Sequence, residues 1–115
     1  MKPYYKIGQV IHHKLFDYRG VILKADDYFK LTDIWYDNMA KSKPPKDKPW
    51  CSVLVHNQTH TTYVAERNLS SDYSKKEIIH PMIPIYFMTL KNGVYSKSLN
   101  WIDGEPAMPN EIYMA

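Results

Sequence analysis

A pair of strand-like runs constrains the fold of this chain more than any other feature. The runs are WCSVLVH at 50–56 and TTYVAERNL at 61–69, and the polar link NQTH between them suits a hairpin. Side chains of a strand alternate between two faces, yet neither face of either run is cleanly polar. We therefore expect both faces to be covered at least in part, as in a small β-barrel.

The segment before these runs predicts a second hairpin. Residues 7–26, IGQVIHHKLFDYRGVILKAD, contain an apolar run, a tight reversal around Asp17 and Gly20, and then a β-branched run. One strand should begin near Ile7, and the other should follow the reversal.

A change of period after this hairpin indicates a short helical insertion. Leu31, Trp35 and Met39 recur at a spacing of four with Ile34 beside them, and Thr32 is a candidate N-cap. Trp35 and Tyr36 are neighbours on this helix, so we expect them to face inward to different degrees, with one of them the better surface candidate. The prolines of KSKPPKDKP then end the helix in an exposed loop.

The C-terminal third looks less regular. Pro81 and Pro84 interrupt the pattern, a helical turn is expected over 85–90, and Asn92-Gly93 predicts a turn. The fold class is therefore mainly β, with a short helical insertion and an irregular C-terminal extension.

Composition indicates one packed domain of a reducing compartment. The chain has 115 residues, of which 44% are hydrophobic, and a length near the mode for single domains favours one core. Cys51 is the only cysteine, so no intrachain disulfide can form. Because no run of about 18 apolar residues occurs, we expect a cytoplasmic protein with no membrane contact.

Charge is distributed unevenly along the chain. The net charge is +3, and segment 41–48 holds four lysines against Asp47. From residue 98 onward there are three acidic residues and no basic one. The lysine segment is the best signal for a polyanionic partner, although a solvated loop that only keeps the protein soluble is the simpler interpretation.

Catalytic and metal-binding patterns are weak. The five histidines include the adjacent His12 and His13, which would point to opposite faces of a strand and could not both bind one ion. Cys51 lies in an apolar strand, where a buried, inert thiol is expected. Glu66 and Arg67 are better placed to fix a turn than to act as an acid and its partner. We predict no metal site, no cofactor and no catalytic residues.

Taken in order, four motifs resemble one known family. They are IGQVIHHKLFDYRGVILKAD, PWCSVLV, YVAERNL and IIHPMIPIYF, and the resemblance runs from about residue 7 to residue 95. The combination resembles the YccV-like family, also called HspQ or hemimethylated DNA-binding domains, and most closely the domain at the C-terminus of certain F-box proteins. No F-box precedes the motifs, so a role in ubiquitin ligase assembly does not carry over.

The resemblance implies a small SH3-like β-barrel without cofactor or catalysis. It implies two activities: binding of hemimethylated DNA, and action as an adaptor that presents client proteins to a protease. On this basis we expect a barrel domain over residues 1–97 and an acidic tail over 98–115. The DNA-contact candidates are Lys14, Arg19, Lys24, Lys41, Lys43, Lys46 and Lys48, and the candidates for reading a methyl group are Tyr18, Trp50 and Tyr63.

Several alternatives stay open at the level of sequence. Aromatic residues of this kind form a core more often than a ligand surface. The physiological partner can be DNA, a protease or a client protein, and self-association through an exposed strand edge is also compatible with the sequence. The tail can screen the lysine segment or be disordered.

Overall fold

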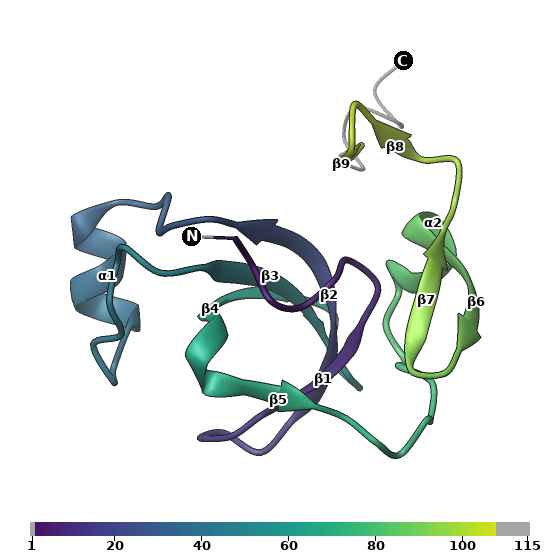
Figure 1. Ribbon diagram of the computed structural model, residues 1–115, viewed down its shortest axis with the longest axis horizontal. Helices are drawn as coiled ribbons and strands as arrows, with labels where there is room; N and C mark the ends of the chain where they lie inside the picture. The colour runs from purple at the N-terminus through teal and green to yellow at the C-terminus, as the bar shows by residue number, and fades with distance from the viewer. Residues whose placement is uncertain (1, 108–115) are drawn as a thin grey trace.

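The main element of the computed structural model, which describes residues 2–107, is a strongly curled antiparallel sheet of five strands (Figure 1). The strand order is β4-β3-β2-β1-β5. The strands are β1 (Val10–His13), β2 (Arg19–Asp26), β3 (Trp50–Val55), β4 (Thr61–Ala65) and β5 (Leu69–Ser71). The prediction of a mainly β chain is therefore confirmed.

The curled sheet is not closed into a barrel by strand pairing. β4 and β5 stand at opposite ends of the strand order, and within residues 2–107 they do not pair with each other. A single 3-10 turn, η1 (Glu66–Asn68), connects them. The closed SH3-like barrel that we expected is thus not confirmed, because this turn takes the place of the last strand–strand contact.

Both predicted hairpins are present. β1 and β2 pair antiparallel with Val10 opposite Val21, and β3 and β4 pair with Cys51 opposite Val64. The first strand begins at Val10 and not near Ile7, because Gly8 adopts a left-handed conformation with φ of 89°.

Both faces of the sheet are covered, as the lack of a polar face in β3 and β4 predicted. One face contributes to a five-strand core, and the other packs against the C-terminal third of the chain. The five-strand core consists of Ile11, Ile22, Cys51, Val53, Val64 and Leu69. The second core consists of Val10, Val21, Leu23, Leu54, Ile78, Tyr86, Phe87 and Tyr95.

The C-terminal third is more regular than we expected. It contains α2 (Ile83–Tyr86) and the hairpin of β6 (Phe87–Lys91) and β7 (Val94–Lys97). The predicted helical turn over 85–90 was therefore wrong in position, since the chain is extended from Phe87. A second small hairpin follows, formed by β8 (Trp101–Ile102) and β9 (Glu105–Pro106).

Two features explain the β6–β7 hairpin. Asn92 and Gly93 both have positive φ, 52° and 78°, which is the conformation of a tight hairpin turn and confirms the predicted turn. The hairpin also joins the sheet edge, because the Val10 N–H donates to the Gly93 carbonyl over 2.9 Å. Strand pairing and the burial of Phe87 therefore outweigh the local helical pattern of residues 85–90.

Gly8 provides a test of how the hairpin joins the sheet. A Cβ at this position would overlap the carbonyl oxygen of Tyr95 in β7. We expect Gly8→Ala to lower the free energy of unfolding by about 2 kcal/mol or more, because the left-handed conformation alone costs a non-glycine residue about 1–2 kcal/mol. Gly104 has a similar φ of 79° with nothing within 4 Å of its Cβ position. Gly104→Ala is the matched control, and equal losses in urea unfolding would contradict this account.

Helix α1 (Asp33–Met39) closes one end of the sheet. Its N-cap is Thr32, whose hydroxyl accepts the Trp35 N–H, as the sequence predicted. The buried side of the helix differs from the expected one: Leu31 is 45% and Met39 60% exposed.

The contacts of α1 are aromatic. Trp35 and Tyr36 are both partly buried against the ring of Phe29, so neither is a free surface residue, contrary to our expectation. We call this group the aromatic cluster; it consists of Phe29, Trp35, Tyr36, Ala40, Trp50, Tyr63 and Ala65.

His13 fixes the turn between β1 and β2. It is 1% exposed, and its ring stacks between Phe16 and Tyr18 at centroid distances of 4.7 and 4.9 Å. Nδ1 accepts the backbone N–H groups of Leu15 and Phe16. The ring is thus a neutral acceptor, and burial, aided by the neighbouring His12, lowers its pKa below the ordinary value of 6.5.

This pKa predicts that the fold weakens on mild acidification. The unfolded chain takes up a proton at His13 as the pH falls below about 6.5, whereas the folded chain resists it until its lower pKa is reached. Stability should be fully present above pH 6.5 and decline below it, measured as the urea midpoint at pH 7.5 and pH 5.5. The His13→Gln variant should be less stable than the parent protein at pH 7.5, but its stability should fall less between pH 7.5 and pH 5.5. The exposed His60→Gln should keep it, and an unchanged decline in His13→Gln would contradict the assignment.

Candidate nucleic-acid interface

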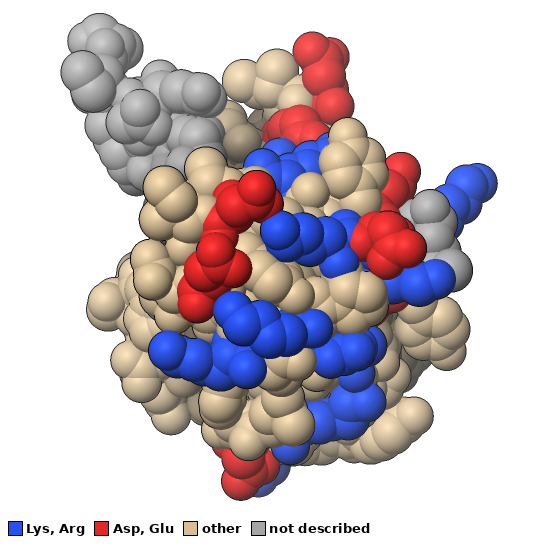
Figure 2. Space-filling view, turned by 90° about the vertical axis from the view of Figure 1, so that its left-hand side faces the viewer, with Lys and Arg blue, Asp and Glu red and all other residues tan. Residues whose placement is uncertain are grey.

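Basic side chains gather on the side of the molecule that carries α1. Figure 2 shows Lys and Arg side chains in a band across this face, with acidic side chains beside it. The lysine segment 41–48 follows α1 directly in the chain, and Arg67 reaches it through a hydrogen bond from Nη2 to the Ser42 carbonyl over 3.3 Å. Residues far apart in sequence therefore meet at this face.

Glu66, Arg67 and Asn68 form the turn that holds these parts together. Oε2 of Glu66 accepts the backbone N–H groups of Tyr4 and Tyr5 over 2.7 and 3.1 Å. Asn68 donates to the hydroxyl of Ser42. The predicted turn is present, but the side-chain hydrogen bonds of the motif reach distant residues, so they secure the N-terminal segment and the lysine segment and do not cap the turn itself.

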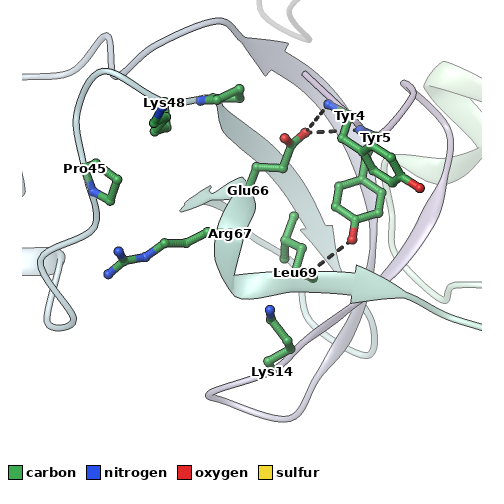
Figure 3. Close-up of a pocket in the computed structure, with 9 residues that line it drawn as sticks. Tyr4, Tyr5, Lys14, Pro45, Lys48, Glu66, Arg67 and Leu69 are labelled. Atoms are coloured by element: carbon green, nitrogen blue, oxygen red, sulfur yellow. Dashed lines mark hydrogen bonds between the residues drawn. The ribbon is translucent and has the colours of Figure 1, made fainter. Parts of the chain in front are cut away.

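A groove opens beside this turn, and we call it the basic groove (Figure 3). Its volume is about 470 Å³, and it is lined by Tyr4, Tyr5, Lys14, Pro45, Lys48, Pro49, Glu66, Arg67 and Leu69. Its walls are largely apolar, and the ends of three basic side chains surround it. Such a combination suits a ligand with an anionic group and an apolar part.

The cations of the basic groove are available to a ligand. Among the described residues, Glu66 is the only acidic one in the lining, and its carboxylate already accepts two backbone N–H groups. Within residues 2–107, neither Lys14 nor Lys48 forms an ion pair. Burial, followed by the nearby Glu66, raises the pKa of Tyr5, so its hydroxyl keeps its proton.

The lysine segment divides into two free and two paired residues. Lys46 lies 2.7 Å from Asp33 and Lys43 lies 3.9 Å from Asp37, so α1 partly neutralises both. The hydrogen bond between Lys46 and Asp33 raises the pKa of the lysine and lowers that of the carboxyl group. Lys41 and Lys48 form no ion pair with any described residue, which leaves them as the stronger phosphate candidates of the four.

Arg19 and Lys24 lie outside the basic groove. Nε of Arg19 donates to Asp72 over 3.0 Å, and its other nitrogens donate to the carbonyls of Lys76 and Glu77. Arg19 thus anchors the 72–77 segment. Lys24 lies 3.4 Å from Glu105 of β9, so a part of the predicted acidic tail screens Lys24 and not the lysine segment.

The predicted aromatic contacts lie apart from the basic groove as well. Trp50 is 2% exposed, and Nε1 donates to the Pro45 carbonyl over 3.1 Å. The ring lies inside the aromatic cluster, so the structure gives no support for Trp50 as a ligand contact.

Tyr63 and Tyr18 are partly buried. The Tyr63 hydroxyl donates to the buried Asp26 over 2.6 Å, and burial followed by this bond raises its pKa. Tyr18 stacks on His13, and burial raises its pKa to about 12. Both serve packing first.

Groups with catalytic chemistry do not converge. Cys51 is fully buried, as expected, and burial, with smaller effects of Glu66 and Asp26, raises its pKa to about 12. His56 and His80 accept the backbone N–H groups of Ile79 and Met82. Over residues 2–107 no three His, Cys, Asp or Glu side chains lie close enough to hold a metal ion. Neither helix of this part is long and apolar enough to cross a bilayer.

Sequence reasoning missed the tyrosines of the groove and the place of Arg67 in its lining. Tyr4 and Tyr5 stand near the N-terminus, 61 or more residues before the carboxylate that holds them. The only local signal was an adjacent aromatic pair outside any strand pattern. Arg67 was considered only as a partner of Glu66, although the two side chains diverge (Figure 3).

These features define a class of protein: a small β-rich domain whose described part has an apolar groove, cations without ion pairs around it, and no converging catalytic groups. Comparison with family models identifies it further. The chain belongs to the YccV-like family, described as hemimethylated DNA-binding protein YccV like, whose model matches residues 3–94. The match covers every residue of the basic groove.

Proposed function

We propose that this protein is a non-enzymatic DNA-binding module whose basic groove contacts the phosphate backbone. The observation that carries the proposal is the group of Lys14, Lys48 and Arg67 around one groove, in which the one carboxylate from the described residues accepts the backbone N–H groups of Tyr4 and Tyr5. Membership of a hemimethylated DNA-binding family supports DNA as the polyanion. Lys41, next to the Ser42 that Arg67 holds, adds a fourth cation.

Binding by four cations would depend strongly on salt. The logarithm of the affinity should fall with the logarithm of salt concentration at a slope of about −3.6, since each phosphate contact contributes about −0.9. The two salt-bridged lysines, together with Arg19 and Lys24, are left out of the interface. Its residues lie within 1–97, which we propose as the binding domain, with 98–115 as an acidic tail.

A preference for hemimethylated DNA is the finer part of the proposal. It is tested by fluorescence anisotropy with one labelled duplex in hemimethylated, fully methylated and unmethylated forms, at low and physiological salt. A preference for the hemimethylated form that survives physiological salt is expected. Equal binding of all three forms that vanishes at physiological salt would refute methyl reading by this chain.

A protein-interaction adaptor that presents clients to a protease is the second candidate. The observation that favours it is the set of exposed apolar side chains near α1: Phe16 is 65%, Ile34 75% and Met39 60% exposed. Charge separates the two functions, because the adaptor should tolerate loss of Lys14 and Lys48. Ile34→Ser with Met39→Ser should leave DNA binding intact and abolish binding of a protein partner.

A further inference from the structure

The N-terminal tyrosine pair is held in place beside the cations of the basic groove. The rings of Tyr4 and Tyr5 meet edge to face at a centroid distance of 5.0 Å. Glu66 accepts both backbone N–H groups, and the Tyr5 hydroxyl donates to the Leu69 carbonyl over 3.1 Å. Residues this close to a terminus are poorly ordered unless they are tied down, and here three hydrogen bonds tie them.

This tether leaves the ring of Tyr4 uncovered. Tyr4 is 79% exposed, whereas the aromatic side chains of the aromatic cluster are partly or fully buried. An exposed ring gains little for the fold, because little of its apolar surface leaves water. Because Glu66 holds the backbone N–H of Tyr4, this uncovered ring stays beside the groove, where a ligand can reach it.

The arrangement of charge around the pair narrows the ligand class. Figure 3 shows the tyrosine rings on one side of Glu66 and Leu69, and the side chains of Lys48 and Arg67 on the other. Lys14 also lines the groove, next to Leu69 in Figure 3. A ligand that spans the groove would meet an aromatic face at one end and cations at the other.

A nucleotide with an unpaired base has this combination of groups. Its phosphate can lie against cations while its base stacks on an aromatic ring, and such stacking depends little on sequence. In an intact duplex the base faces are covered by their neighbours, so a duplex would use only the cations. The exposed Tyr4 ring would then have no role.

We propose that the basic groove accepts an unpaired nucleotide, with the base stacked on Tyr4 and the phosphate held by Lys14, Lys48 and Arg67. The nucleotide can come from a single strand or from a duplex whose base has been extruded. This inference deepens the DNA-binding function proposed above and rests on it. Tyr5 and Glu66 act as positioning residues, because they hold Tyr4 through backbone and packing contacts.

The first test compares Tyr4→Ala with Tyr4→Phe on three labelled probes: a single strand, a duplex with one unpaired adenine, and the fully paired duplex. Tyr4→Ala should weaken binding of the first two probes about tenfold, since stacking is worth roughly 1–3 kcal/mol per base. Tyr4→Phe keeps the ring and should bind within about twofold of the parent. Equal binding of all probes by Tyr4→Ala and the parent would overturn the proposal.

A second experiment distinguishes a single strand from an extruded base as the source of the nucleotide. One base of the paired duplex is replaced by 2-aminopurine, and the fluorescence of 2-aminopurine rises when it leaves the base stack. A rise that Tyr4→Ala abolishes supports extrusion, and no rise together with Tyr4-dependent binding of the single strand supports a single-stranded ligand. Failure of the proposed DNA-binding function can be told apart from failure of this inference. If the basic groove does not contact the phosphate backbone, Lys14→Ser with Lys48→Ser will leave duplex binding unchanged. Absence of binding to every probe would overturn both proposals.

Glu66→Ala gives a second test, because a purely electrostatic role and a positioning role of Glu66 predict opposite changes in affinity. Removing a carboxylate from a groove of cations should strengthen binding of any anion if charge alone matters. If Glu66 instead positions the tyrosines, the substitution should weaken single-strand binding severalfold, and the thermal unfolding midpoint would be measured to show that the variant is folded. Stronger binding by a folded Glu66→Ala variant would overturn the positioning role.

Discussion

Lys14→Ser with Lys48→Ser is expected to weaken DNA binding about thirtyfold near 0.15 M salt. Each lost phosphate contact reduces the affinity about fivefold there and flattens the salt slope by about 0.9, so the slope should change from about −3.6 to about −1.8. Both side chains lie in the basic groove without an ion pair among the described residues. Anisotropy titrations over a range of salt concentrations measure both quantities.

The matched control stays within the same lysine segment. Lys43→Ser with Lys46→Ser also removes two positive charges, but these lysines are paired with Asp37 and Asp33. Affinity and salt slope should therefore change much less than in the first variant. Equal losses for the two variants would show that only net charge matters and that the groove is not the interface.

Trp50→Ala is expected to lower the free energy of unfolding by about 3–5 kcal/mol, the usual cost of deleting a large buried aromatic side chain. The ring contacts Phe29 and stacks on Tyr63 at centroid distances of 4.9 and 5.3 Å. Its Nε1–H also ties the lysine segment through the Pro45 carbonyl. The loss would be measured by urea unfolding.

A milder substitution separates packing from the hydrogen bond. Trp50→Phe keeps an aromatic ring but cannot donate to Pro45, so it should cost less than Trp50→Ala. Any loss of DNA binding in either variant should follow the fraction unfolded, because Trp50 is 2% exposed. If either variant were fully folded and still failed to bind DNA, Trp50 would have to be considered a DNA contact again.

Local chemistry accounts for much of what could be predicted. Thr32 caps α1 because a hydroxyl accepts a backbone N–H within its own turn, which needs no distant residue. Asn92 and Gly93 turn the chain because both tolerate positive φ. The alternating runs of β3 and β4 predicted cover on both faces, since their residue types alternate without a polar face.

Long-range contacts decided the features that were misread. The segment from Phe87 has a helical pattern but pairs with β7, with Phe87 opposite Lys97. Trp50 was a candidate ligand contact with a core role as the alternative, and the packing of α1 over it placed it inside the aromatic cluster. Neither outcome could be read from neighbouring residues, because the burying partner comes from elsewhere in the chain.

The amino-acid sequence by itself determined the mainly β character, the two hairpins, the short capped helix and membership of the YccV-like family. Only the tertiary structure decided which cations are free. Folding pairs Lys43 and Lys46 with α1, commits Arg19 to Asp72, and brings Lys14, Lys48 and Arg67 to one groove. The physical reason is that a positive charge stays uncompensated only where the fold places no carboxylate beside it, and that depends on distances in space.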